Sequence, residues 1–418
     1  MRLWICLILL GLSACAGPPE TTIEREIAGQ RAETHRTLDG DSAGPEGASP
    51  GTSSPRVADS IADLVAAQRA LAPYGSKVGD APDVFQIPAA ARPLFADLEH
   101  AWERYLGEQL QVIDLGAAER TIANALLNPL KRRGVMQGYE AQAFGALLAV
   151  WVQKHAGDVL GVVVSSTLDC SPDDTLFLFS TAGGQVQRLA TVGAKKRVSL
   201  ADGQLGLEYA LVPTSGGTPE IVVASATPWC ASAWRTLRYE VLSLPSPAVR
   251  PRATFQHESS VWIGNGTWEL QAGDDWFQIR HDTWDTVGSS VVAGRVARYT
   301  RSGGRWSPTT PRLSSAADVI HAWAALPPPL ARELVLPEAR AAAADLHAAF
   351  RRNAGKERGY VQLTASAKNE NRLTFECEDC RVLPKHLDLT LTRVADSWRI
   401  SNLKKAEREQ DEQDEQND

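Results

Sequence analysis

Apolar positions along the chain follow two different spacings, which divide it into helical and strand-forming parts. From Val57 to about residue 156, apolar residues recur every three or four positions, as in SIADLVAAQRAL and PLFADLEHAWERYLGEQLQVI. This period, close to 3.6, predicts amphipathic helices. The helical patterns cover residues 60–71, 94–113, 118–128 and 139–154. We therefore expect a helical region over residues 57–156.

From Val159 the pattern changes to short runs of β-branched and aromatic residues separated by Gly, Pro and Asp, which is typical of antiparallel strands. Phe179, Tyr239 and Tyr299 each end such a run and are spaced 60 residues apart. The common spacing predicts three repeats of about 60 residues in a β domain over residues 157–312. Because propellers typically have at least four blades, we expect a sandwich or a partial, propeller-like arrangement.

Residues 313–403 combine both patterns. A helical stretch, SSAADVIHAWAAL, breaks at three prolines, and PEARAAAADLHAAFRRNAG resumes the helical spacing. Four strand-like runs follow: GYVQLTA, RLTFECE, LDLTLTR and SWRISNL. We predict a small α+β domain there, followed by a charged tail over residues 404–418, so the fold class is mixed α and β with several domains.

The first fifteen residues, MRLWICLILLGLSAC, carry one arginine and a short apolar core. Ten apolar residues are too few to cross a bilayer, and the layout is that of a secretory signal peptide. Leu12-Ser13-Ala14-Cys15 resembles the lipobox of bacterial lipoproteins. The resemblance covers residues 1–15 alone and implies that Cys15 is acylated and becomes the first residue of the mature chain. An ordinary signal peptide is the alternative.

Residues 16–56 are rich in Gly, Pro, Ser, Thr, Glu and Ala and contain few large apolar side chains. Such a composition predicts a disordered tether, because it cannot bury enough surface to offset chain entropy. The lipobox resemblance then implies a protein anchored to the membrane by lipid in the cell envelope. Ala16, in place of Asp, favours the outer over the inner membrane if the organism has two membranes.

The charge balance is mildly acidic, with 43 Lys and Arg against 50 Asp and Glu and a net charge of −7. Cleavage before Cys15 removes one arginine and brings the charge to about −8. No basic block precedes the C-terminus, which argues against nucleic acid as a partner, because that affinity depends on Lys and Arg neutralising phosphates.

Cysteines of an exported chain can form disulfides. Cys6 leaves with the leader and Cys15 is the lipid site, so four remain: Cys170, Cys230, Cys377 and Cys380. Because two of them are 60 residues apart in corresponding repeats, we favour pairs 170–230 and 377–380. The alternatives are 170–377 with 230–380, and 170–380 with 230–377.

The sequence Cys-Glu-Asp-Cys at 377–380 favours a structural disulfide over a redox site, since its two carboxylates raise a thiol pKa. A zinc site would need two further ligands. Asp173-Asp174 and Asp274-Asp275 lack the spacing of a calcium loop and are predicted to be turn residues. We expect neither a metal nor a cofactor.

The sequence contains no HExxH, Walker or strand-flanked GxGxxG motif, and no GxSxG elbow between a predicted strand and a predicted helix. Gly264-Asn265-Gly266, between strand patterns, predicts a hairpin turn. His281, Asp282 and Asp285 could supply a catalytic group near Ser289. Adjacent strand residues point to opposite faces, however, which separates His281 from Asp282.

Seven of the twelve tryptophans lie between residues 229 and 306. Trp268, Trp276 and Trp306 fall in strand-like runs and are predicted to pack in the core. Trp229 and Trp284 lie in corresponding loops of two repeats, so we expect these two side chains to contact a partner.

Two hypotheses for function follow. The first is a non-enzymatic, lipid-anchored envelope protein whose β domain binds a protein or glycan partner. The second is an envelope hydrolase whose active site is built around His281, Asp282 and Asp285, with His257 near them. Convergence of these side chains in one cleft would favour the hydrolase.

Overall fold

The computed structural model describes most of the chain beyond residue 54. The described residues are 55–75, 86–138, 144–168, 171–194, 198–199, 203–213, 220–227, 234–244, 252–262, 268–284, 292–353, 361–365, 372–377 and 386–405. All of them belong to one compact unit, Ser54–Asp418.

Within the described residues, three helices precede the first sheet: α2 (Pro55–Gly75), α3 (Arg92–Leu110) and α4 (Glu119–Arg132). Their buried positions follow the helical spacing of the sequence, as with Leu98, Trp102, Tyr105 and Leu106 on α3. The predicted helices over 60–71, 94–113 and 118–128 are therefore confirmed, with shifts of a few residues at their ends.

The predicted helix over residues 139–154 is wrong, because Leu147–His155 forms strand β1. Val150 and Val152 are buried while Trp151 and Gln153, between and after them, are exposed, which is the alternation of a strand. Gly145 has φ of +78°, a left-handed conformation that ends any helical path before the strand. The β region thus begins about ten residues before the expected boundary.

In the parts of the chain that the structure describes, sixteen strands form four antiparallel sheets of four strands, and each sheet is built from strands consecutive in the chain. Sheet 1 contains β1, β2 (Val159–Leu168), β3 (Ser171–Ser180) and β4 (Gln187–Val192). Sheet 2 contains β5 (Leu205–Val212), β6 (Glu220–Ala226), β7 (Trp234–Ser243) and β8 (Arg252–Trp262). Sheet 3 contains β9 (Trp268–Gly273), β10 (Trp276–Trp284), β11 (Val292–Ser302) and β12 (Arg305–Thr309). Sheet 4 contains β13 (Val361–Ala365), β14 (Arg372–Cys377), β15 (His386–Val394) and β16 (Ser397–Lys405).

Strands β2 of sheet 1 and β6 of sheet 2 are covered on both faces, as the strand alternation shows. On β2, Val162 and Val164 pack against α2–α4, whereas Val163 packs against sheet 2. On β6, Ile221 faces sheet 1 and Val222 faces sheet 3. All seven residues of β6 are buried, which explains why its sequence, EIVVASA, lacks a polar face.

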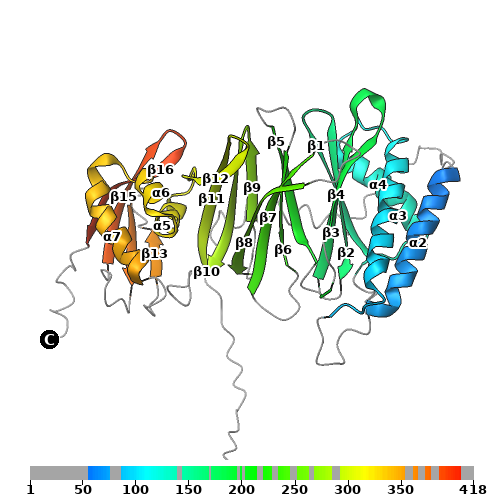
Figure 1. Ribbon diagram of the computed structural model, residues 1–418, viewed down its shortest axis with the longest axis horizontal. Coiled ribbons are helices and arrows are strands. Elements are labelled where there is room, and N and C mark those ends of the chain that lie inside the picture. Colours follow the sequence, from blue (N-terminus) through cyan, green and yellow to red (C-terminus); the bar gives the residue numbers. More distant parts are fainter. Residues whose placement is uncertain are drawn as a thin grey trace, which may run out of the picture. The chain divides into compact units, whose positions relative to one another are not determined.

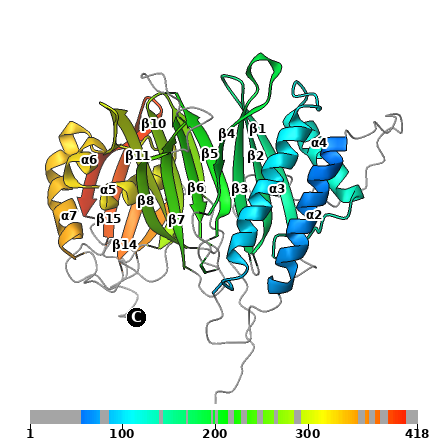
Figure 2. The same cartoon turned by 45° about the vertical axis from the view of Figure 1, so that its right-hand side comes forward.

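The far face of sheet 3 lies against α5 (Ala316–Ala325). Helices α6 (Pro328–Glu333) and α7 (Arg340–Asn353) share an apolar cluster with α5 and sheet 4. Figures 1 and 2 show α2–α4 beside sheet 1, and α5–α7 beside sheet 4. The elements predicted over residues 313–403, helices followed by four strands, are all present.

Phe179, Tyr239 and Tyr299, which the sequence spaces 60 residues apart, lie on β3, β7 and β11. These are the third strands of their sheets, and all three rings are buried. The spacing therefore marks corresponding strands of sheets 1–3.

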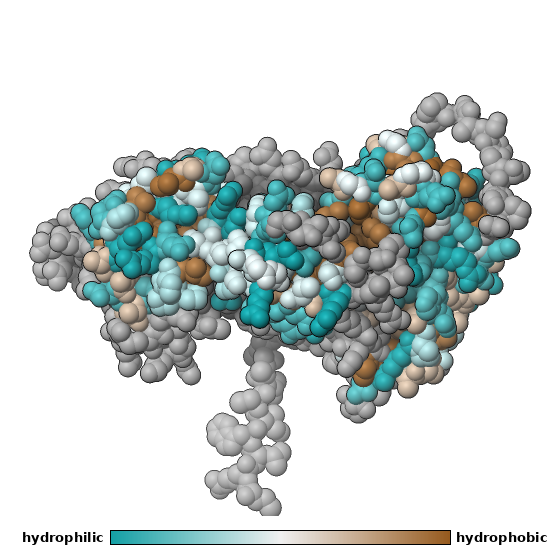
Figure 3. All heavy atoms as spheres, turned by 45° about the horizontal axis from the view of Figure 1, so that its top comes forward, coloured by the Kyte–Doolittle hydropathy of each residue, from teal (hydrophilic) through white to brown (hydrophobic). Residues whose placement is uncertain are grey.

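The surface is mixed in polarity. On the face shown in Figure 3, hydrophobic residues lie in separate groups among hydrophilic ones. Exposed large hydrophobic side chains in the described parts are Val112, Trp151, Val198 and Val394. Of the helices that the structure describes, none has the length and apolar character needed to cross a membrane.

Candidate functional site

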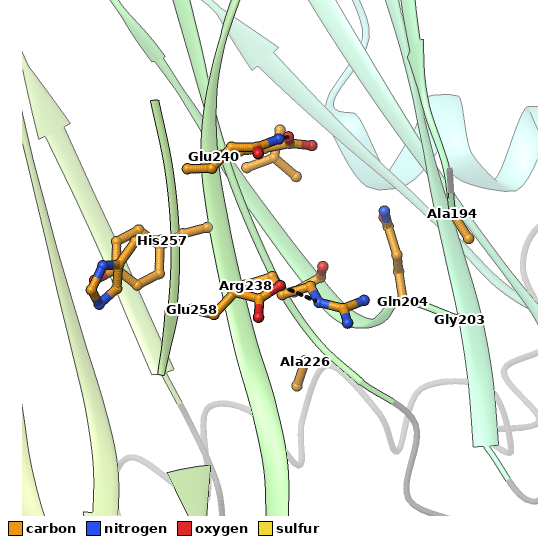
Figure 4. Close-up of a pocket in the computed structure, with 12 residues that line it drawn as sticks. Ala194, Gly203, Gln204, Ala226, Arg238, Glu240, His257 and Glu258 are labelled. Atoms are coloured by element: carbon orange, nitrogen blue, oxygen red, sulfur yellow. Dashed lines mark hydrogen bonds and ion pairs between the residues drawn. The ribbon is translucent and has the colours of Figure 1, made fainter. Parts of the chain in front are cut away.

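A cavity of about 570 Å³ opens between sheets 1 and 2. One wall comes from β7 and β8, where Arg238, Glu240, Gln256 and Glu258 alternate with residues that face sheet 3. Gln204, at the entry to β5, lies across from them (Figure 4). The volume falls within the range of about 300–1,000 Å³ typical of small-ligand pockets.

The charged groups of this wall are paired across the two strands. Arg238 Nε lies 3.0 Å from Glu258 Oε1, and Gln256 Nε2 donates to Glu240 Oε2 at 3.0 Å. Each pair joins residues directly opposite in the β7–β8 register. Because the Arg238–Glu258 pair is about half exposed, it adds little stability, at most about 1 kcal/mol. The wall instead presents a fixed array of donors and acceptors to the cavity.

Two buried carboxylates hold the segment that carries Gln204. Asp173 Oδ1 accepts the Gln204 N–H at 2.9 Å, and Asp174 Oδ2 accepts the Leu207 N–H at 3.0 Å. The prediction that Asp173-Asp174 are turn residues is wrong, since both lie within β3 and are 2% exposed. Hydrogen bonds from the next sheet to one oxygen of each carboxylate hold them there, a long-range contact that local sequence does not reveal. Burial raises the pKa of Asp174 to about 6.

Asp274-Asp275, by contrast, occupy the turn between β9 and β10, as predicted. Asp275 has φ of 55°, a left-handed conformation that Asp tolerates better than most residues.

A second group of functional candidates lies between sheets 2 and 3. The His257 ring is 5.0 Å from the Tyr239 ring, and the Tyr239 and Tyr299 hydroxyls are 3.0 Å apart. His257 projects from the face of β8 opposite the cavity wall (Figure 4). Burial and the nearby Arg295 guanidinium lower the pKa of His257 and lower that of His281 to about 3. Both imidazoles are therefore neutral near pH 7.

The hydrolase hypothesis needs a histidine that a substrate can reach. His281 is only 1% exposed, on a strand packed against the neighbouring sheet. The side chain of Asp282 and all of Asp285 lie outside the described residues. The structure thus places the exposed His257 and the buried His281 near one another, with the His257 ring beside the Tyr239 and Tyr299 rings.

The remaining sequence candidates have mixed outcomes. Trp268 and Trp306 are buried between sheets 2 and 3. Trp276 is half-buried, and the Arg298 guanidinium carbon lies 3.9 Å from the centre of its ring. Outside the described residues or side chains lie Cys15, Cys170, Cys230, Cys377, Cys380, Trp229 and Trp284. Among the described residues, no group of three or more His, Cys, Asp or Glu is arranged to hold a metal.

Sequence reasoning missed the cavity wall, although a pattern for it exists. Arg238 and Glu240 on β7, and Gln256 and Glu258 on β8, alternate with the aromatic side chains of Tyr239 and His257. A polar face on a central strand of a stacked sheet indicates a place where the next sheet does not cover it.

No protein-family model matches the sequence, and no curated protein matches it. Among solved structures, a glycosyl hydrolase from Bacteroides ovatus aligns over 62% of this chain and 84% of its own, with 6% identity and a TM-score of 0.15. At that score the likeness carries no argument about fold or activity.

Proposed function

We propose that this chain is a lipid-anchored protein of the bacterial cell envelope, whose β sheets bind a protein or glycan partner without catalysing a reaction. The lipobox resemblance at Cys15 supports the anchor and the envelope location. The cavity between sheets 1 and 2 supports the binding role, and it is the observation that carries the proposal.

The cavity chemistry suits recognition. Arg238 and Gln256 supply N–H donors, while Glu240 and Glu258 supply acceptors, and both pairs are held in register by neighbouring strands. Side chains on strands lose less freedom on binding than side chains on loops, so such a wall is preorganised.

The binding role is tested with the full-length chain, solubilised in detergent from the envelope of the native bacterium and purified with whatever partner it retains. Arg238→Ala and Glu240→Ala each remove one side of a cavity pair, and we expect each to weaken partner binding about tenfold or more. Arg104→Ala is the matched control, because Arg104 forms a comparable exposed ion pair with Asp63, between α3 and α2. Unchanged partner binding by both cavity variants would contradict the proposal.

The anchor has a separate test. Cys15→Ser removes the acylated thiol, and we expect the variant to move from the membrane fraction to the soluble fraction on cell fractionation. Retention of the variant in membranes would refute lipid anchoring and leave the cavity proposal untouched.

A further inference from the structure

A second, smaller groove of about 390 Å³ lies at the opposite edge of sheets 1 and 2 from the cavity. It lies where the first strands of the sheets, β1 and β5, meet, and it also touches Leu270 on β9. Its polar lining residues are Glu119, Gln153, Glu208 and Tyr209, and Trp151 also lines it. None of these residues was singled out by the sequence patterns.

Trp151 is the unusual member of this groove. It is 36% exposed, the one tryptophan among the described side chains that counts as exposed. On β1, Trp151 and Gln153 share the face that looks toward sheet 2, while Val150 and Val152 pack on the helices. An exposed indole keeps apolar surface in contact with water. A flat ligand that covers the ring removes this surface from water, and the removal favours binding.

The polar groups beside Trp151 are held in place by backbone contacts. Glu119 Oε1 accepts the Lys154 N–H at 2.7 Å, and Glu208 Oε2 accepts the Leu270 N–H at 3.1 Å. The Tyr209 side chain is 8% exposed, and its hydroxyl has no hydrogen-bond partner among the described residues. The groove therefore combines one exposed aromatic ring with oriented acceptors and the amide of Gln153.

The charges favour a neutral ligand over an anion. Lys154 Nζ donates to the carbonyl of Ala117 at 2.5 Å, which places an ammonium beside the first turn of α4, where Glu119 lies. This positive charge offsets one of the two carboxylates. The carboxylates act here as fixed acceptors for hydroxyl groups, and the Gln153 amide can both donate and accept.

We propose that this groove binds a sugar ring of an uncharged glycan, with the apolar face of the ring stacked on Trp151. Its hydroxyls donate to Glu119 and Glu208 and exchange hydrogen bonds with Gln153. The site is separate from the cavity at Arg238, so it does not rest on the proposed function.

The probes are soluble oligomers of N-acetylglucosamine and of glucose, titrated calorimetrically into the full-length chain in detergent micelles. We expect one of these oligomers to bind, Trp151→Ala to weaken its affinity about tenfold or more, and Trp151→Phe to retain most of it. Val112→Ala, at another exposed apolar position, is the matched control and should bind as the natural chain does. Circular dichroism and thermal unfolding establish that each variant is folded.

Glu119→Gln separates stacking from hydrogen bonding, because it keeps the shape of the side chain and removes the charge. We expect it to weaken sugar binding about fivefold, since hydrogen bonds to charged acceptors are the stronger ones. The proposal is overturned if neither oligosaccharide binds, or if Trp151→Ala binds as tightly as the natural chain. The proposal is also overturned if oligolysine, a cationic ligand, binds in place of sugar and Trp151→Ala weakens that binding. Loss of self-association in Trp151→Ala would overturn it too, because the groove would then bind a second copy of the chain.

Discussion

At the scale of single residues, the buried carboxylates of β3 are the least expected feature. Asp173 and Asp174 lie on β3 shortly before its apolar run, residues 176–179, and each accepts a backbone N–H from the start of sheet 2. A buried carboxylate without enough partners costs free energy, so it prefers to be protonated. This explains the direction of the Asp174 pKa shift.

Asp174 should make stability depend on pH. Its folded pKa of about 6 exceeds the ordinary value of 3.8, so below about pH 4 it is protonated in both states and imposes no cost. Between pH 4 and 6 the unfolded chain ionises first, and folding loses up to about 3 kcal/mol. We expect Asp174→Asn to remove this loss, as measured by urea unfolding at several pH values.

The matched control for that measurement is Asp173→Asn, which makes the same change one position earlier and leaves Asp174 in place. It should retain the fall in unfolding free energy between pH 4 and 6. An identical pH profile for Asp174→Asn and the natural chain would show that the carboxyl of Asp174 is not the cause.

Glycines differ in what surrounds them, and this predicts opposite effects of the same substitution. A β-carbon at Gly161 would overlap the Tyr209 hydroxyl, whereas one at Gly107, on α3, would meet nothing within 4 Å. We expect Gly161→Ala to lower the unfolding free energy by about 2 kcal/mol. Gly107→Ala should raise it by about 0.5–1 kcal/mol, because alanine favours helix. Equal effects in chemical denaturation would contradict this account.

At the scale of elements, periodicity identified most helices and strands but misjudged which strands pair. Gly264-Asn265-Gly266 was predicted to join a hairpin, yet β8 pairs with β7 and β9 pairs with β10, so the segment connects two sheets. The residues 263–267 themselves lie outside the described chain. Strand alternation is a local property, and it is the same whether the next strand joins the sheet or starts another.

The contact between sheets 2 and 3 depends on a buried polar link. Glu220, at the start of β6, accepts the Trp306 indole N–H at 3.0 Å and lies 3.3 Å from Arg301 Nε. Thr254 donates to its other oxygen at 3.3 Å. These three partners come from β8, β11 and β12, so one carboxylate joins two sheets.

Removal of this carboxylate should be costly. Glu220→Ala leaves the largely buried Arg301 without its nearest counter-charge, and we expect the unfolding free energy to fall by about 3–5 kcal/mol. Asp63→Ala, which breaks the exposed Asp63–Arg104 pair, should cost less than about 1 kcal/mol. Urea unfolding of both variants tests the difference, and a loss below 1 kcal/mol for Glu220→Ala would show that the link is not a major one.

At the scale of the whole molecule, sheets 1–3 pack face to face, with α2–α4 on sheet 1 and α5 on sheet 3. This packing leaves two openings between sheets 1 and 2, the cavity at β7–β8 and the groove at β1–β5. Both border the apolar core between these sheets, because Val223 lines the cavity and Val163 and Leu207 line the groove.

The positions of Cys170, Cys230, Cys377 and Cys380 provide a test of the predicted correspondence between the first two sheets. In the sequence, Cys170 comes after β2, the second strand of sheet 1, and Cys230 comes after β6, the second strand of sheet 2. We expect mass spectrometry of the non-reduced chain, digested with protease, to find one peptide linking Cys170 to Cys230 and another linking Cys377 to Cys380. Free thiols at Cys170 and Cys230, or links between these two and the C-terminal pair, would show that this pairing is wrong.

The sequence by itself determined the helices of residues 55–132, the strands from Val159 onward and the C-terminal helices and strands, because backbone geometry imposes a local period on burial. It also marked the third strands of sheets 1–3 through Phe179, Tyr239 and Tyr299. Only the tertiary structure decided that Leu147–His155 is a strand, that Asp173 and Asp174 are buried, and that Arg238 and Trp151 line openings. These features depend on which segments, distant in the sequence, pack against each face of a strand. The spacing of residues along the chain does not specify that packing.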